Sequence, residues 1–160
     1  MLEAALKQEP GDVGYRDGLY RTRGVAAMFL RQIGKRREAA ENWEQVVELA
    51  GSAEKPLRLV EATEFWIDAK DFPRATEAAR RASTELPKDA PVALWQRHAT
   101  VLGRLARLVE SDETIPKDDR SKIAAELRTA ANTARDRAGI GPIESMLHNA
   151  FDFFKSPTSE

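Results

Sequence analysis

The feature that most constrains this sequence is a spacing of small and apolar residues that occurs twice. Ala39 is followed by apolar residues four and seven positions later, and Ala75, 36 residues after Ala39, begins a second set with the same spacing. Trp95 begins what looks like a third unit. Intervals of three and four residues place side chains on one face of a helix. A recurrence of this length therefore predicts stacked helical repeats, each covering an apolar face of the next.

Proline and glycine divide the rest of the chain into helices. Residues with high helix propensity dominate, and we find no alternating pattern that would indicate a strand. Gly34 has the residue type that commonly ends a helix, while Pro56 and Pro91 have the type that opens one. The expected helices are 2–8, 15–33, 36–49, 56–70, 73–86, 91–110, 118–138 and 142–155.

The repeat resembles the tetratricopeptide (TPR) family over roughly residues 15–138. Besides the spacing after Ala39 and Ala75, Pro87 falls twelve residues after Ala75, where that family ends a repeat, and Trp95 has the family's tryptophan. Two departures are the lack of a glycine at Lys70, the counterpart of Gly34, and a long connector at 110–116.

The TPR resemblance implies an all-α, right-handed solenoid of antiparallel helix pairs. We expect about three pairs and a C-terminal capping helix within a single domain, 1–155. The implied repeats are 15–52, 56–88 and 91–138, followed by the capping helix 142–155 and a flexible tail, 156–160.

Three segments are also similar to the TPR-bearing C-terminal regions of certain bacterial serine/threonine protein kinases. They are residues 15–17, the turn 34–39 and the connector 114–117. This resemblance implies a non-catalytic regulatory or docking region of a bacterial signalling protein. The sequence contains no glycine-rich loop, His-Arg-Asp or Asp-Phe-Gly motif of a kinase domain.

Composition argues against several other functions. The formal net charge is -1, which disfavours a protein that grips nucleic acid. The absence of cysteine removes disulfides, thiolate metal sites and cysteine nucleophiles, and no apolar run is long enough to span a membrane. His98 and His148 lack the spacing of metal ligands and are expected to be ordinary helix residues. We therefore expect a cytoplasmic protein that is not an enzyme and needs no metal or cofactor.

The acidic clusters have a structural interpretation. Asp112-Glu113 and Asp118-Asp119 lie in or beside the connector that precedes a helix, where negative charge stabilises the helix N-terminus. Capping is favoured over acid–base catalysis, which needs a cleft and carboxyl groups with separated pKa values.

A partner-binding groove is implied by the TPR resemblance, because the first helix of each pair lines the concave face in that family. We expect a protein or peptide partner there, with the groove lined by Arg21, Met28, Arg31, Gln32, Val60, Glu64, Asp68, Gln96, Thr100 and Arg104. The first repeat is locally basic, which indicates either solvated charge or a patch for an acidic peptide or phosphate; its basic residues are Arg21, Arg23, Arg31, Lys35, Arg36 and Arg37.

The C-terminal apolar residues allow two interpretations. Met146, Leu147, Phe151 and Phe154 would cover the last helix pair if the final helix is a cap. Alternatively, this helix docks in the groove of a second copy, and the chain is a self-assembly module that forms a homodimer.

Overall fold

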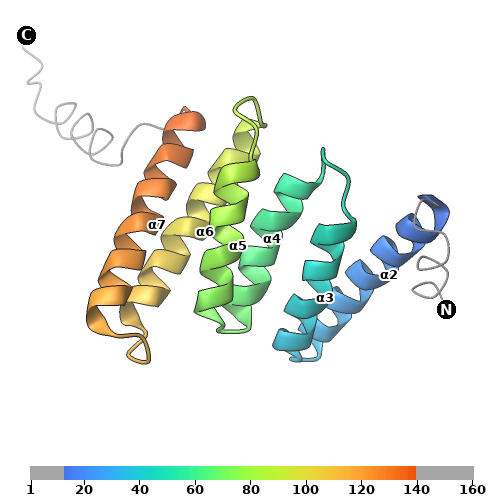
Figure 1. Cartoon of the computed structure of the whole chain (residues 1–160), viewed down its shortest axis with the longest axis horizontal. Coiled ribbons are helices and arrows are strands. Elements are labelled where there is room, and N and C mark those ends of the chain that lie inside the picture. Colours follow the sequence, from blue (N-terminus) through green and yellow to red (C-terminus); the bar gives the residue numbers. More distant parts are fainter. Residues whose placement is uncertain (1–12, 140–160) are drawn as a thin grey trace, which may run out of the picture.

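The computed structural model describes residues 13–139, and this part of the chain is all α-helical. Its helices lie side by side in chain order, with α2 and α7 at opposite ends of the row (Figure 1). The most extensive contacts join α2 with α3, α4 with α5, and α6 with α7, so the fold is built from sequential helix pairs. The six helices are α2 Val13–Gln32, α3 Arg36–Leu49, α4 Lys55–Asp68, α5 Phe72–Glu85, α6 Val92–Ser111 and α7 Lys117–Arg137.

The structure confirms the all-α fold class and the paired helices. Each of the six helices expected between residues 15 and 138 is present, and α3 has the expected bounds. The other ends differ by one or two residues, as is usual where a terminal turn frays. The helices expected at 2–8 and 142–155, the tail 156–160, and His148 lie outside the described residues.

Local sequence signals explain where several helices begin. The Asp71 side chain accepts a hydrogen bond from the Arg74 backbone N–H at 3.2 Å and so caps α5. Asp118 and Asp119 lie in the first turn of α7, while Arg135 and Arg137 lie in its last turn. Both placements complement the helix dipole, in agreement with the structural interpretation of these carboxylates.

Asp112 organises the connector between α6 and α7 rather than a helix N-terminus. Its carboxylate accepts hydrogen bonds from the Thr114 backbone N–H at 3.0 Å and from the Thr114 hydroxyl at 2.7 Å. This short-range turn is a common use of aspartate in loops.

The turns inside the first two pairs repeat each other at an offset of 36 residues. After α2, the backbone N–H of Lys35 bonds to the carbonyl of Leu30 at 2.9 Å; after α4, Asp71 bonds to Trp66 at 3.1 Å. Gly34 has φ 82° and its counterpart Lys70 has φ 57°, so both adopt the left-handed conformation. The missing glycine at Lys70 therefore does not change the turn.

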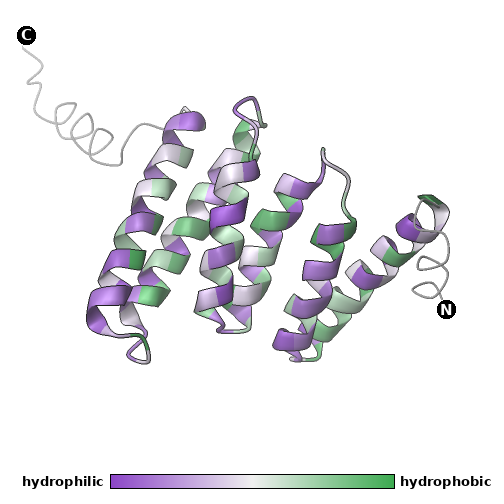
Figure 2. Ribbon diagram, in the orientation of Figure 1, coloured by the Kyte–Doolittle hydropathy of each residue, from purple (hydrophilic) through white to green (hydrophobic). Residues whose placement is uncertain are grey.

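The core runs continuously through the described helices and combines small and large side chains. Ala27, Ala39 and Ala75 are fully buried, which fits helices that approach closely. Trp66 and Leu105 are buried among them and fill larger spaces. Figure 2 shows hydrophobic and hydrophilic residues along each ribbon, the mixture expected of helices that pack on one side only.

Ion pairs link the second helices of successive pairs. Arg81 on α5 contacts Glu44 and Glu48 on α3 at 3.3 and 2.8 Å. Arg80, also on α5, donates two hydrogen bonds of 2.7 Å to Glu126 on α7. None of the described helices combines the length and hydropathy that crossing a membrane requires.

Candidate binding face

A row of carboxylates on α4 meets arginines from the helices on either side. Glu61 and Asp68 lie seven residues apart, about two helical turns. Arg97 and Arg104 on α6 have the same separation and form ion pairs with Glu61 at 3.2 Å and with Asp68 at 3.6 Å. Arg31 on α2 pairs with the other oxygen of Asp68. The first helices of the three pairs thus meet along one surface, which we call the α2–α4–α6 face.

The strongest contact on this face is bidentate. Arg97 Nε and Nη2 donate to the two carboxylate oxygens of Glu64 at 3.1 and 2.8 Å. These hydrogen bonds, together with the charges of Glu64 and Glu61, raise the pKa of the Arg97 guanidinium, so it stays charged. The carboxylates of α4 are therefore largely neutralised by the protein itself.

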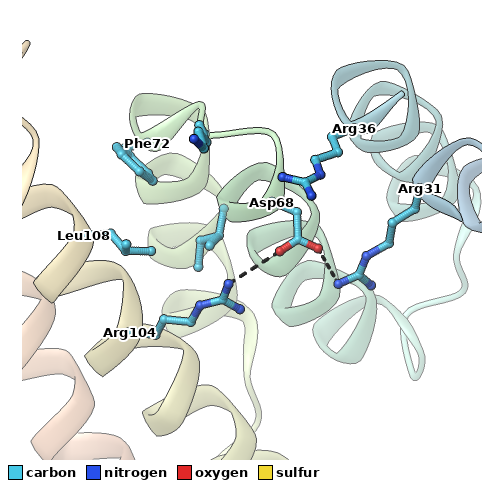
Figure 3. A pocket seen from close by; sticks show the side chains of 8 residues that line it. Arg31, Arg36, Asp68, Phe72, Arg104 and Leu108 are labelled. Carbon is cyan, nitrogen blue, oxygen red and sulfur yellow. Dashed lines mark ion pairs between the residues drawn. The ribbon is translucent and has the colours of Figure 1, made fainter. Parts of the chain in front are cut away.

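Around Asp68, positively charged side chains outnumber carboxylates. A cavity of about 420 Å³ lies between the ends of α2, α4 and α6. Figure 3 shows Asp68 between Arg31 and Arg104, with Arg36 nearby. Four cationic side chains and one carboxylate line this space, which leaves a surplus of positive charge. We call it the basic cavity; its lining residues are Arg31, Arg36, Ile67, Asp68, Lys70, Phe72, Arg104 and Leu108.

Aromatic packing fixes one of the four cations in place. The Arg31 guanidinium carbon lies 4.9 Å from the centre of the Phe65 ring, in a cation–π contact. Phe65 in turn stacks on Trp43, with ring centres 4.6 Å apart. Arg31 is thus held both by the Phe65 ring and by the Asp68 carboxylate, and little further ordering is needed for it to meet an anion.

A second hollow, beside α2, is apolar. It has a volume of about 660 Å³ and is walled by α2 side chains, with Trp43 of α3 and Arg58 of α4 also lining it. Val25, Met28 and Phe29 are 71%, 48% and 59% exposed, high values for large apolar residues. We call this hollow the apolar groove.

A polar network closes one end of the apolar groove. The Tyr20 hydroxyl donates to Glu54 at 2.8 Å and accepts a hydrogen bond from Arg58 Nε at 2.7 Å. Burial of the hydroxyl, together with its bond to Glu54, raises the pKa of Tyr20. This hydrogen-bond network therefore links α2 to α4, both of which line the groove.

The apolar groove and the basic cavity both reach the C-terminal end of α2. Gln32 lines the groove and Arg31 lines the cavity, at the last two positions of α2. Trp43 lines the groove and stacks on the ring that carries Arg31. An extended ligand that follows α2 in the groove would reach the cavity at the end of the helix.

The residues expected to line one groove lie in several separate sites of the structure. Arg21, Met28 and Gln32 line the apolar groove. Arg31, Asp68 and Arg104 line the basic cavity, and Glu64 belongs to the carboxylate row. Thr100 instead lines a separate hollow between α6 and α7, and Gln96 is exposed without lining either of the two sites.

The placement of Val60 in the groove was wrong. Val60 is fully buried in the core, whereas its neighbour Glu61 pairs with Arg97 across the α2–α4–α6 face. Rows at positions 60, 64, 68 and at 61, 64, 68 both fit helical spacing, so periodicity alone did not separate them. The same one-residue error occurs in the next repeat, where Arg97, and not the predicted Gln96, forms the ion pair across the face.

Several residues of the two sites and of the α2–α4–α6 face were missed in the sequence. Val25 and Phe29 could have been found from their three- and four-residue spacing to Gln32, Met28 and Arg21 along α2. Arg97 could have been found because it follows Glu61 by the repeat length of 36 residues. Lys70 was noticed only for its missing glycine, and helical spacing did not place its side chain in the cavity because it lies in a turn.

A further hollow, of about 400 Å³, surrounds Ser83 and His98. The Ser83 hydroxyl and His98 Nε2 are 2.9 Å apart, and His98 is 1% exposed. Within residues 13–139, neither His98 Nδ1 nor the nearby Trp95 Nε1 has a hydrogen-bond partner. The same part of the chain contains no cluster of three or more potential metal ligands.

Comparison of the chain with protein families, with curated proteins and with solved structures found no match.

Proposed function

We propose that this chain is a TPR-like, non-catalytic interaction module that binds a peptide segment of a partner protein. The peptide lies along α2 in the apolar groove and extends toward the basic cavity. The observation that carries the proposal is the groove itself, which is about 660 Å³ in volume and walled by exposed Val25, Met28 and Phe29. Apolar side chains exposed next to fixed polar groups are typical of binding sites.

The repeated turn geometry supports a TPR-like architecture. The two turns related by 36 residues, the left-handed Gly34 and Lys70 and the fully buried Ala39 and Ala75 all follow the spacing from which the resemblance was drawn. In such a solenoid the α2–α4–α6 face is the concave side, which offers an extended surface to a ligand.

The contact between Ser83 and His98 does not favour catalysis. A serine nucleophile requires a base that a third residue orients through its other ring nitrogen. His98 Nδ1 has no such partner among residues 13–139. The pKa of His98 is lowered to about 4 by burial, which makes the ring a weak base.

The proposal is tested by selecting peptides from a random library against the whole chain and measuring their affinity for variants. Met28→Glu places a charge on the apolar wall and is expected to weaken the selected peptides about tenfold or more, because the charge must be desolvated on binding. Dissociation constants from fluorescence anisotropy check this.

Val92→Glu is the matched control, because Val92 is 52% exposed, close to the 48% of Met28, but lines neither site. Peptides that bind both variants as tightly as the original chain would place the binding surface elsewhere. Failure to select any peptide would reject the module as a peptide binder.

Self-assembly is the second candidate. The observation that favours it is the same apolar stripe on α2, the first described helix of the row, which no neighbouring described helix covers. A second copy could cover it. The residues first considered for such a contact, Met146, Leu147, Phe151 and Phe154, lie outside the described residues.

A further inference from the structure

We infer that the basic cavity binds a phosphate group carried by the peptide that occupies the apolar groove. This inference rests on the proposed function, and it adds the chemical class of the ligand. Three features carry it: an uncompensated positive charge in the cavity, a lysine held in an unfavourable backbone conformation, and the position of both the groove and the cavity at the C-terminal end of α2.

The charge of the cavity calls for a dianion. Arg31 and Arg104 share the single carboxylate of Asp68, while Arg36 and Lys70 pair with no carboxylate within residues 13–139. Neighbouring Arg37, by contrast, contacts both Glu41 and Asp71. One carboxylate ligand would leave most of the surplus in place, whereas a phosphate monoester brings nearly two negative charges and three acceptor oxygens.

Lys70 occupies a backbone position that suits glycine. Its φ of 57° is the only positive value at a non-glycine residue within the described part of the chain. The equivalent turn in the first pair has Gly34. A side chain that persists in such a conformation is a reason to look for a function. Lys70 lines the basic cavity, so the left-handed turn places a cation at its wall.

The surroundings of the cavity favour a peptide over a polyanion. A nucleic acid strand needs a continuous track of positive charge. The α2–α4–α6 face instead continues from Asp68 to Glu64 and Glu61, which Arg97 neutralises, so the surplus positive charge does not extend along the face. Ile67, Phe72 and Leu108 add apolar wall next to the cations, which suits the side chains beside a phosphorylated residue.

The test compares two matched peptide libraries on the whole chain. One has phosphoserine at a fixed central position and the other has serine there, with the same random flanking residues. The best phosphopeptide is then measured by fluorescence anisotropy in its phosphoserine, glutamate and serine forms. We expect the phosphoserine form to bind about tenfold or more tightly than the serine form, since arginine–phosphate hydrogen bonds are charge-assisted. Raising the salt concentration should reduce this difference.

Two variants and a control assign the effect to the cavity. Lys70→Gly removes one cation and relieves the backbone, so the melting temperature should not fall while phosphopeptide affinity does. Arg36→Gln removes a second cation that has no ion-pair partner in the described residues. Arg107→Gln, an exposed arginine that does not line the cavity, should leave affinity unchanged.

The outcomes separate this inference from the proposed function. Equal binding of the phosphoserine and serine forms, with both lost in Met28→Glu, would overturn the phosphate site and leave the groove as a peptide site. If neither library yields a binder, both proposals fail. Inorganic phosphate or a single-stranded RNA oligonucleotide that binds as tightly as the phosphopeptide would also overturn the inference, because the cavity would then not read a phosphorylated peptide.

Discussion

At the scale of single residues, the fold depends on side chains that tolerate neither charge nor extra volume. His98 shows the first restriction. It is 1% exposed, and burial lowers its pKa to about 4. The neutral ring is therefore the form that the folded protein accepts, while the unfolded chain protonates near the ordinary value of 6.5. Stability and pH are linked through this difference.

Acidification below pH 6.5 should destabilise the protein through His98. The folded state binds fewer protons than the unfolded state between pH 6.5 and about 4, so stability is full above this window and falls as pH decreases through it. From pH 7 to pH 5 the free energy of unfolding should drop by about 2 kcal/mol. Urea unfolding at both pH values measures this.

The control for the pH experiment is His98→Gln, which cannot gain a proton. Its stability should change much less between pH 7 and pH 5, while His148 is common to both proteins and cancels in the comparison. An equally steep decline in His98→Gln would assign the effect to the carboxylates instead.

Ala39 shows the second restriction. It is fully buried in α3, and Ala39→Arg would have to place both a larger side chain and a charge in the core. We expect the free energy of unfolding to fall by at least about 1–3 kcal/mol from overpacking alone. Ala125→Arg, at an exposed position of α7, should change the free energy of unfolding little. Thermal melts of both variants check this: the melting temperature should fall in Ala39→Arg and stay nearly unchanged in Ala125→Arg.

At the scale of elements, the turns have requirements of their own. Gly34 and Lys70 both adopt left-handed backbone in the same hydrogen-bonded turn, although one has no side chain and the other a long one. This conformation is unfavourable by roughly 1–2 kcal/mol for a residue with a Cβ atom. The hydrogen bonds and packing of the turn evidently outweigh that strain at Lys70.

Replacement of Gly34 and of Gly24 by alanine should change the free energy of unfolding in opposite directions. Gly34→Ala puts a Cβ atom at φ 82° and should destabilise the protein by about 1 kcal/mol. Gly24→Ala lies within α2, where the new methyl would be 4.0 Å from Val46 Cγ2, an ordinary contact, and should stabilise it by about 1 kcal/mol through helix propensity. Urea unfolding of both variants checks the signs, and two changes of the same sign would contradict this account.

The sequence predicted the helices and their pairing well because both depend on local spacing. Pro56, Gly34 and the recurrence from Ala39 to Ala75 all act within one or two elements. The binding face depends instead on how separate helices lie beside each other. Lys70 and Arg36 reach the basic cavity from the ends of two different helix pairs. The side of α4 that faces outward was misjudged by one residue, at Val60, because two helical rows fit the same spacing.

At the scale of the whole molecule, the exposed stripe of α2 could serve a peptide or a second copy, and charge favours the peptide. The α2 sequence contains four arginines, Arg16, Arg21, Arg23 and Arg31, against one aspartate. A symmetric dimer through α2 would place the same basic surface on both sides of the contact, where like charges repel. A stable dimer also requires some 20–30 residues a side, far more than one stripe.

We therefore expect light scattering to give a monomer mass near 17.8 kDa at several protein concentrations. The apolar groove would then be open to a ligand in solution. A dimer that disappears in Phe29→Glu would assign the stripe to self-assembly and displace the peptide proposal. A dimer that persists in Phe29→Glu but is lost when Phe151 and Phe154 are replaced by polar residues would instead place the contact in the C-terminal segment and leave the groove free. Because added salt screens the repulsion between α2 surfaces, only the first kind of dimer should strengthen as ionic strength rises.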